Sequence, residues 1–343
     1  MEEGTLWWHA HSDWSRATVH GAIIVYPRNG TSYPFANPHT EVPIILGEWW
    51  KSDIRAVESE FLRTGGDPNV SDALPINGTF KLVVEHGETY LLRMVNVGMI
   101  DLFFFGVAKH QLTVAGTDGT YTKATKKAYV STVGIPFDNT TTIVQYKGNY
   151  TPSSPLSLPL LPPYNDTNTS ATFTGSLRSF ASIDHPSNVP LSMTTKLIFT
   201  VSVNTVPCAN NNSCAGPNGT RLAASVNNIS FHVPSNIDIL EAYYKNINGV
   251  YGDKFSNIPP LIFNFAVDYL PLELEIPQRG WEVKVLEYNS TVKLIFQVPN
   301  LVQGTHHPMH LHGYSFYVVG WGFGNFDKNK DPLRYNPIMP KIY

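Results

Sequence analysis

Two short segments of the sequence carry histidines at spacings that suit metal binding. In the first, His9 and His11 are separated by a single residue within Trp7–Trp14. Side chains two residues apart in a strand point to the same face, so both imidazoles are predicted to project together. Imidazole is a good ligand for several transition metals, and the pair suits one shared ion or two adjacent ions. Two ordinary surface histidines are the alternative for this pair taken alone.

The second segment, His306–Gly313, contains four histidines within seven residues. His310 and His312 are again two residues apart and are predicted to share a face. His307 is set apart from them by a proline and is predicted to face a different metal ion. An incidental histidine-rich surface loop is the alternative. We favour a ligand segment, because the run leads directly into a strongly apolar stretch that starts at Tyr314.

The sequence contains two cysteines, Cys208 and Cys214, in a polar loop. Their spacing permits a local disulfide, which an oxidising compartment would preserve; two unpaired thiols are the alternative. A blue-copper centre needs a cysteine thiolate beside two imidazoles. Neither cysteine stands next to a histidine, so neither has the sequence context of such a ligand.

The elements predicted to position these groups are mostly short strands. Runs of β-forming residues cover 18–26, 42–49, 292–298 and 314–319. A helix is predicted between Ser52-Asp53 and Gly65-Gly66, and a second one from Ser235-Asn236 towards Gly249. The 26 prolines and 25 glycines interrupt the chain often. Many short strands between such turns favour an all-β class of sandwiches or barrels.

Composition excludes several classes of function. Lys and Arg total 24 against 27 Asp and Glu, which gives a net charge of −3 and no basic surface for a nucleic acid. The sequence has no run of eighteen apolar residues, so a membrane span is not predicted. With 42% apolar residues over 343 positions, the chain can bury a substantial core and is predicted to be ordered.

The chain resembles the plant laccases of the multicopper oxidase family. The resemblance covers nearly the whole sequence and rests on Trp7–Trp14, 38–44, 47–50, 104–112, 137–142, 214–220 and His306–Gly313. It implies an all-β fold of cupredoxin-like Greek-key β-sandwich domains, incomplete in this chain. Residues 1–35 would be the C-terminal remnant of a first domain and 36–148 a shortened second domain. Residues 149–192 would form a Pro/Ser-rich linker, and 193–343 a third domain that is cut short at its C-terminal end.

The resemblance also implies a set of copper ligands and a reaction. His9, His11 and His312 resemble ligands of the two type 3 coppers, His310 a type 2 ligand, and His307 the histidine of the type 1 site. The family holds four copper ions per chain. It oxidises phenols, such as lignin precursors, by one-electron steps and reduces O₂ to water. The implied partners are therefore phenols and O₂, without nucleic acid or membrane, and the chain is predicted to be a monomer.

The sequence departs from the family pattern in ways that affect this expectation. The His-Trp-His-Gly and His-Cys-His motifs of the family are not in the printed sequence, and with the latter the type 1 cysteine is missing. We therefore expect a truncated or mis-spliced laccase chain. A catalytically inactive fragment and a secreted metal-binding glycoprotein are the alternatives; an ascorbate-oxidase-like enzyme fits the motifs less well. Compared with the family, the second domain is also shortened near 76–79 and 129–137, which predicts exposed apolar surface and marginal folding.

The sequence is also typical of a secreted glycoprotein. Acceptor triplets of the Asn-x-Ser/Thr type are dense and predict surface glycosylation. They begin at Asn29, Asn69, Asn77, Asn139, Asn149, Asn165, Asn168, Asn211, Asn218, Asn228 and Asn289. The residues after Met1 do not form a secretory signal, whereas the family is secreted to the plant cell wall. We expect an extracellular protein of the apoplast.

Overall fold

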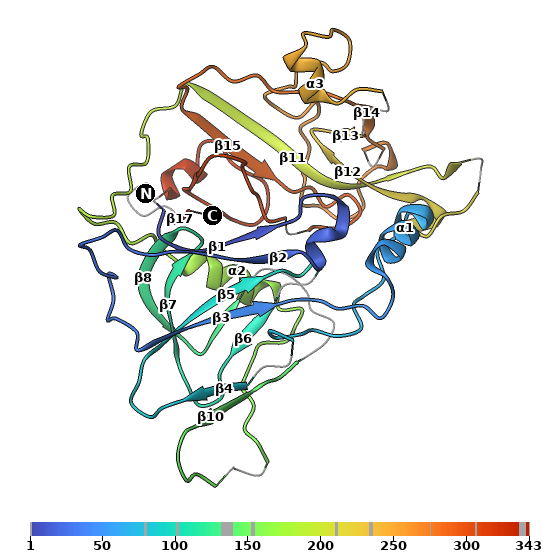
Figure 1. Cartoon of the computed structure of the whole chain (residues 1–343). Coiled ribbons are helices and arrows are strands. Elements are labelled where there is room, and N and C mark those ends of the chain that lie inside the picture. Colours follow the sequence, from blue (N-terminus) through green and yellow to red (C-terminus); the bar gives the residue numbers. More distant parts are fainter. Residues whose placement is uncertain are drawn as a thin grey trace.

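The structure is a computed structural model in which short strands dominate (Figure 1). It describes residues 2–78, 81–100, 103–131, 140–151, 155–209, 212–232, 236–274, 276–305, 307–335 and 341–342. The predicted glycosylation sites Asn139 and Asn211 lie outside the described residues, as does His306.

The chain begins with an antiparallel hairpin that carries the first histidine pair. Strand β1 (Gly4–His9) pairs with β2 (His20–Val25), in a register that runs from Gly4 opposite Val25 to His9 opposite His20. The 3₁₀ turn η1 (Asp13–Ala17) connects the two strands. His9 is thus the last residue of β1, and His11 lies just beyond the strand end, before η1.

Four strand pairs follow, and they form the region predicted to be the second domain. Their members are β3 (Thr40–Leu46) with β5 (Tyr90–Asn96), β4 (Lys81–Val84) with β10 (Ile143–Tyr146), β6 (Phe104–Gly106) with β9 (Tyr129–Ser131), and β7 (Leu112–Thr117) with β8 (Thr120–Lys127). Ile44 and Leu46 of β3 pack with Ile76 in a small core. Burial of such side chains stabilises a fold by roughly 1.5–3 kcal/mol each.

A five-stranded sheet forms the last region, in the order β14-β13-β12-β11-β15. Its members are β11 (Thr195–Val206), β12 (Arg221–Val226), β13 (Ile229–Phe231), β14 (Gln278–Gly280) and β15 (Val292–Gln297). The short 3₁₀ turns η3 (Pro217–Gly219), η4 (Leu272–Leu274) and η5 (Asp331–Arg334) and the pair β16 (Tyr317–Val318) with β17 (Lys341–Ile342) complete the region.

Local sequence signals predicted one helix correctly and missed another. Helix α1 (Ile54–Thr64) begins after Asp53, whose carboxylate accepts two backbone N–H bonds, and ends at Gly65 with a φ of 73°, which confirms the predicted boundaries. Helix α2 (Thr167–Ser176) lies inside the predicted linker and was not expected. Its buried Phe173 shows that this stretch packs against the body of the protein.

Two predicted elements have different bounds in the structure. Helix α3 (Ile239–Tyr244) is capped by Asp238, whose carboxylate accepts the Glu241 N–H at 2.6 Å, and not by the predicted Asn236. Ser235, the other predicted cap residue, lies outside the described residues. The predicted strand over 314–319 is reduced to β16, because Tyr314 N–H donates to the Leu311 carbonyl in a turn instead of joining a sheet.

A buried ionic group fastens the first hairpin to the strands that follow. Arg93 of β5 is 4% exposed and donates from Nε to the Glu41 carboxylate of β3 at 2.7 Å. Its Nη1 donates to the Thr5 hydroxyl of β1 at 2.9 Å, and its Nη2 donates to the Tyr33 hydroxyl at 2.8 Å. One guanidinium therefore joins three segments of the chain and holds β1, with its histidine, against β5.

No helix among the described residues is both long and apolar enough to span a lipid bilayer.

Candidate copper site

Four of the predicted ligands meet in space, although the two pairs are about three hundred residues apart in the sequence. The ring centroids of His9 and His11 are 6.2 Å apart, and the two rings are stacked. His11 and His312 approach to 5.2 Å edge to face, and His310 and His312 to 4.9 Å. The rings form a continuous series from the β1 strand end to the segment before β16.

Two of these three separations fit a pair of imidazoles that share one ion. A metal about 2.0–2.1 Å from a ring nitrogen lies roughly 3 Å from that ring's centroid, so two rings on one ion have centroids up to about 6 Å apart. The His11–His312 and His310–His312 separations fall within this limit. Among the described residues, no three His, Cys, Asp or Glu side chains are already arranged around one point as ligands. The described donor set therefore suits sites with two imidazoles each.

His9 is oriented in the way that metal-binding histidines usually are. Its Nδ1 lies 2.9 Å from the Ala10 carbonyl oxygen, which fixes the tautomer with the proton on Nδ1. The Nε2 lone pair is then available to an ion, and the carbonyl keeps the ring in place. Trp7, two residues earlier in β1, lies beside the same imidazole with a centroid separation of 4.4 Å. The strand period thus places Trp7 and His9 on one face, as expected for β1.

The predicted type 1 ligand, His307, has a separate neighbour. Its Nε2 lies 2.6 Å from the Thr305 hydroxyl oxygen. The thiolate that a type 1 copper needs is not provided by Cys208 or Cys214, because the structure joins these two residues in a disulfide. A disulfide sulfur is not a thiolate, so the residues present fit a histidine copper cluster and do not fit a type 1 centre.

A carboxylate that sequence reasoning did not select lies near His310. Asp118 occupies the turn between β7 and β8, whose backbone accepts the Glu3 and Thr5 N–H groups of the first hairpin. Burial raises the pKa of Asp118, the charge of His310 opposes this rise, and Glu2 adds to it. Around Asp118 the local sequence predicts only a tight turn. The proximity of Asp118 to His310 therefore depends on long-range packing.

Aromatic rings hold the turn that follows His11. Trp14 of η1 packs against Phe61 of α1 with a centroid separation of 5.4 Å and against Trp50 at 5.9 Å. Trp50 is 7% exposed and donates its indole N–H to the Asn69 carbonyl at 2.9 Å. Since Trp14 is only three residues after His11, the position of α1 constrains the backbone that carries this imidazole.

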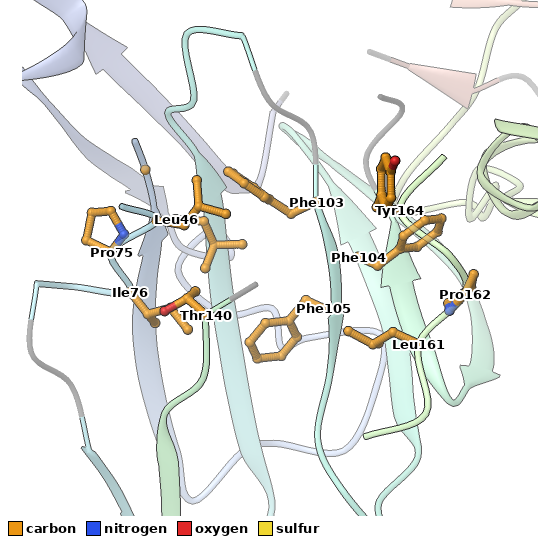
Figure 2. Close-up of a pocket in the computed structure, with 12 residues that line it drawn as sticks. Leu46, Pro75, Ile76, Phe103, Phe104, Phe105, Thr140, Leu161, Pro162 and Tyr164 are labelled. Carbon is orange, nitrogen blue, oxygen red and sulfur yellow. The ribbon is translucent and has the colours of Figure 1, made fainter. Parts of the chain in front are cut away.

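The structure also contains a cavity of about 90 Å³ that is lined mainly by apolar side chains (Figure 2). Its lining residues are Leu46, Gly47, Leu74, Pro75, Ile76, Phe103, Phe104, Phe105, Thr140, Leu161, Pro162 and Tyr164. None of them is a histidine or a carboxylate, so the cavity has no part in the copper cluster. It borders Ile76 and Thr140, next to the two places where the family resemblance predicts missing segments and exposed apolar surface.

Comparison with known proteins agrees with this arrangement. Residues 1–30, 40–172 and 259–341 match three family models, each described as multicopper oxidase. Laccase-14 of Arabidopsis thaliana is 46% identical over 99% of this chain and 66% of its own length. Laccase-3 of Oryza sativa subsp. japonica is 39% identical over 99% of this chain and 67% of its own length. The chain thus spans about two thirds of the length of these relatives.

Solved structures show the same fold. The laccase from Botrytis aclada superposes with a TM-score of 0.62 at 16% identity, over 99% of this chain and 62% of that chain. The histidine cluster between strand-built regions, the family matches and the relatives define a copper-dependent oxidoreductase class. The chain belongs to the multicopper oxidase family, in its plant laccase group. The predicted family and its all-β, cupredoxin-like fold are thereby confirmed.

Proposed function

We propose that the protein functions as a laccase and that His9, His11, His310 and His312 hold the copper at which O₂ is reduced. The reaction removes one electron and one proton from each of four phenols and delivers them to one O₂, which yields four phenoxyl radicals and two water molecules. Copper, when bound, supplies the one-electron redox chemistry. The observation that carries the proposal is the unbroken series of four imidazole rings from two distant segments.

The chain's own residues perform the binding and orienting steps. His11 and His312 approach edge to face and can bind one ion between them, while His310 and His9 extend the series on either side. The Ala10 carbonyl holds the His9 ring with Nε2 free for an ion. Within the family's set of four coppers, we assign His9, His11 and His312 to type 3 ions and His310 to the type 2 ion. His307 stands at the family's type 1 position, for which the described residues supply no thiolate.

We further propose that the protein acts outside the cell, as a monomer, on phenols related to lignin precursors. The Cys208–Cys214 disulfide supports an oxidising compartment, because such bridges persist mainly in secreted proteins. Most of the described acceptor asparagines are exposed, which supports glycosylation of the folded surface.

A second candidate is a secreted copper-binding glycoprotein without oxidase activity. The disulfide favours it, since both cysteines of the sequence are engaged and neither can serve as the thiolate of an electron-accepting centre. This candidate uses the same four imidazoles and differs only in whether electrons from phenols reach O₂.

Copper loading and oxygen consumption separate these functions. The chain is dialysed against Cu(II), and copper content and phenol-dependent O₂ uptake are measured for the wild type, His11→Ala, His312→Ala and the control His86→Ala. His86 lies between β4 and β5 and matches no ligand position. The laccase proposal expects uptake that both cluster variants abolish and the control retains. Copper binding without uptake would favour the second candidate, and a wild-type chain that binds no copper would overturn both.

A further inference from the structure

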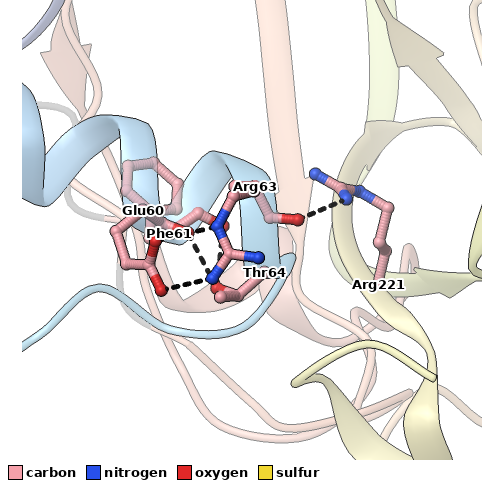
Figure 3. Close-up of polar contacts among 5 residues, drawn as sticks. All are labelled: Glu60, Phe61, Arg63, Thr64 and Arg221. Atoms are coloured by element: carbon pink, nitrogen blue, oxygen red, sulfur yellow. Dashed lines mark hydrogen bonds and ion pairs between the residues drawn. The ribbon is translucent and has the colours of Figure 1, made fainter.

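The C-terminal end of α1 is capped by a distant segment of the chain. An α-helix leaves its last four carbonyl groups without partners inside the helix. In α1 the Leu62 carbonyl accepts from Nη2 of Arg221. The Arg63 carbonyl accepts from Nη1 of Arg221 at 3.3 Å (Figure 3). The next two carbonyls accept backbone N–H groups: Thr64 from Ala215 at 3.0 Å, and Gly65 from Leu222 at 2.7 Å.

All four donors come from one segment of the chain, which begins with the ring closed by the Cys208–Cys214 disulfide and ends with the first two residues of β12. This segment, the disulfide loop, comprises residues 208–222, of which 210 and 211 lie outside the described part of the chain. Cys208 and Cys214 are bonded to each other, and the Cys214 N–H donates to the Gly219 carbonyl at 2.8 Å. The Gly216 N–H donates to the Thr220 carbonyl at 2.9 Å. The disulfide and these turns fix the loop in the shape that directs its donors at α1.

The contact is close, and two glycines permit it. A Cβ atom on Gly65 would lie 2.4 Å from Cγ of Arg221, and one on Gly66 would lie 2.8 Å from Cβ of Ala215. Both separations are shorter than real Cβ contacts allow. The positive charge of Arg221 also lies at the negative end of the helix dipole, which strengthens the cap. The loop and the helix end therefore form one tightly fitted unit.

The opposite side of this unit contacts the turn that carries a copper ligand. Phe61, in the last turn of α1, packs on Trp14, and Trp14 is three residues after His11. The His11 ring in turn meets His312 at 5.2 Å. A series of contacts thus leads from the disulfide loop through Arg221 and the end of α1 to Phe61 and Trp14. From Trp14 the link to the imidazole pair is the backbone itself, through Ser12 and Asp13 to His11.

We propose that Arg221 is a positioning residue: together with the disulfide loop it fixes the end of α1 and so holds His11 at the distance from His312 that copper binding requires. The role for copper rests on the proposed function, whereas the positioning of His11 does not. Residues that orient metal ligands without touching the metal typically change metal affinity by 10- to 100-fold when they are replaced.

The test compares matched variants of the whole chain. Arg221→Met keeps the length of the side chain and removes its donors, and Arg221→Lys keeps the charge without the forked geometry. Cys208→Ser combined with Cys214→Ser opens the loop. Arg63→Met is the control, because Arg63 lies in the same helical turn but pairs with Glu60 of its own helix at 2.7 Å. Thermal unfolding is recorded for each, so that only folded variants are compared.

Three measurements then follow each link separately. Hydrogen exchange of the Ala215 and Leu222 amides reports on the cap of α1. The positioning of His11 is followed by the nuclear Overhauser effect between the ring protons of His11 and His312, recorded on the metal-free, histidine-labelled chain. Titration with Cu(II) reports on metal binding. We expect Arg221→Met and the cysteine variant to exchange roughly tenfold faster, to lose the ring contact and to bind Cu(II) at least about tenfold more weakly. Arg221→Lys should recover part of each effect, and Arg63→Met should match the wild type.

The outcomes distinguish the inference from the function on which it draws. A ring contact that persists in Arg221→Met and in the opened loop, or that is lost equally in Arg63→Met, would overturn the positioning role. If Arg221→Met does not fold, Arg221→Lys and the cysteine variant decide the same question. A ring contact that depends on Arg221 in a chain that binds no Cu(II) would leave the positioning role standing and refute the copper function.

Discussion

At the residue scale, the molecule places its strongest polar interactions where segments from different regions meet. Arg93 is the main example, with a side chain that is 3% exposed and a partner carboxylate on Glu41 that is 22% exposed. Burial by itself raises the pKa of Glu41, but the hydrogen bonds from Arg93 and Tyr33 outweigh burial, and the net pKa is lowered. Burial and the hydrogen bond to Glu41 raise the pKa of Tyr33 to about 12. The group is therefore ionised as a Glu–Arg pair with a neutral tyrosine near neutral pH.

Removing the charge of Glu41 should destabilise the protein, because the buried Arg93 would lose its ionic partner. We expect Glu41→Gln to lower the free energy of unfolding by about 2–3 kcal/mol at pH 7, measured by urea denaturation. The control Glu60→Gln breaks the exposed Glu60–Arg63 pair and should change the free energy of unfolding much less, because solvent screens the two charges. Equal effects of the two changes would contradict the structural role of Arg93.

The pH dependence follows from the same pair. Because the folded-state pKa of Glu41 is lower than its unfolded value, its stabilisation is complete above the unfolded value of about 4.3 and is lost as the pH falls through the folded one. The difference in unfolding free energy between the wild type and Glu41→Gln should therefore shrink as the pH is lowered from 5 into the acid range. A difference that stays constant or grows on acidification would refute this assignment.

Glycosylation should discriminate between acceptor asparagines. The Asn77 amide donates to the Pro43 carbonyl at 2.9 Å and accepts the Ile45 N–H at 2.6 Å, so it is part of the β3 backbone pairing. Asn289 is exposed in a turn. We expect glycopeptide mass spectrometry of the protein secreted from plant cells to find a glycan on Asn289 and none on Asn77. A fully glycosylated Asn77 in folded protein would show that this pairing is not maintained.

At the element scale, the position of α1 is important for the histidine cluster, because the last turn of this helix contacts both η1 and the disulfide loop. Its start is fixed by Asp53, which accepts the Arg55 N–H at 2.9 Å and the Ala56 N–H at 3.3 Å. The cap satisfies donors that the helix itself leaves unpaired. A change at either end of α1 is therefore expected to reach the histidine cluster through Trp14 and Phe61.

Removing the N-cap measures directly how much the capped α1 helix contributes to the free energy of unfolding. Asp53→Ala should lower the free energy of unfolding by about 1 kcal/mol, measured by urea denaturation with circular dichroism detection. Ser59→Ala, at an exposed position in the middle of the same helix, is the control and should change stability by at most a few tenths of a kcal/mol. If both variants matched the wild type, α1 would be frayed rather than held in place.

Local sequence signals predicted α1 well, because its boundaries depend on Asp53 and Gly65 in the chain itself. They failed for α2, where Ser, Thr and Asn suggested a linker. The structure shows that Asp166 caps this helix by accepting the Thr169 N–H at 2.9 Å, and that Phe173 packs against Tyr129 of β9. Local signals also failed for the C-terminal cap of α1. The donors of that cap are more than a hundred and fifty residues away, and the sequence around Arg221 carries no sign of its partner.

At the scale of the whole molecule, the histidine cluster exists only because regions distant in sequence are brought together. The spacing of His9 with His11 and of His310 with His312 could be read as ligand pairs. That the pairs converge followed from the family resemblance and not from the spacing. The contacts that fix the first hairpin, from Arg93 to Thr5 and from Trp14 to Phe61, are long-range and were not predicted. The same holds for the hydrogen bond from the Ser315 hydroxyl to the Glu2 carboxylate at 2.6 Å, which joins the start of the chain to the segment after His312.

The last region exposes apolar side chains on its sheet, and this should be measurable. Leu294 and Phe296 of β15 are 40% and 43% exposed, and Phe231 of β13 is 60% exposed. Contiguous exposed apolar groups bind hydrophobic dyes. We expect the native chain to enhance the fluorescence of anilinonaphthalene sulfonate, and Phe296→Ser to reduce that enhancement. A native chain that leaves the dye dark would mean that these side chains are covered in solution.

The central claim is that imidazoles from the first hairpin and from the segment before β16 bind copper together. Anomalous diffraction at the copper absorption edge, from crystals of the Cu(II)-loaded chain, tests it most directly. The account predicts an anomalous peak between the rings of His11 and His312, within about 2 Å of a ring nitrogen of each, and its loss in His312→Ala. Copper peaks found only elsewhere on the molecule, or a peak that His312→Ala leaves unchanged, would contradict the account.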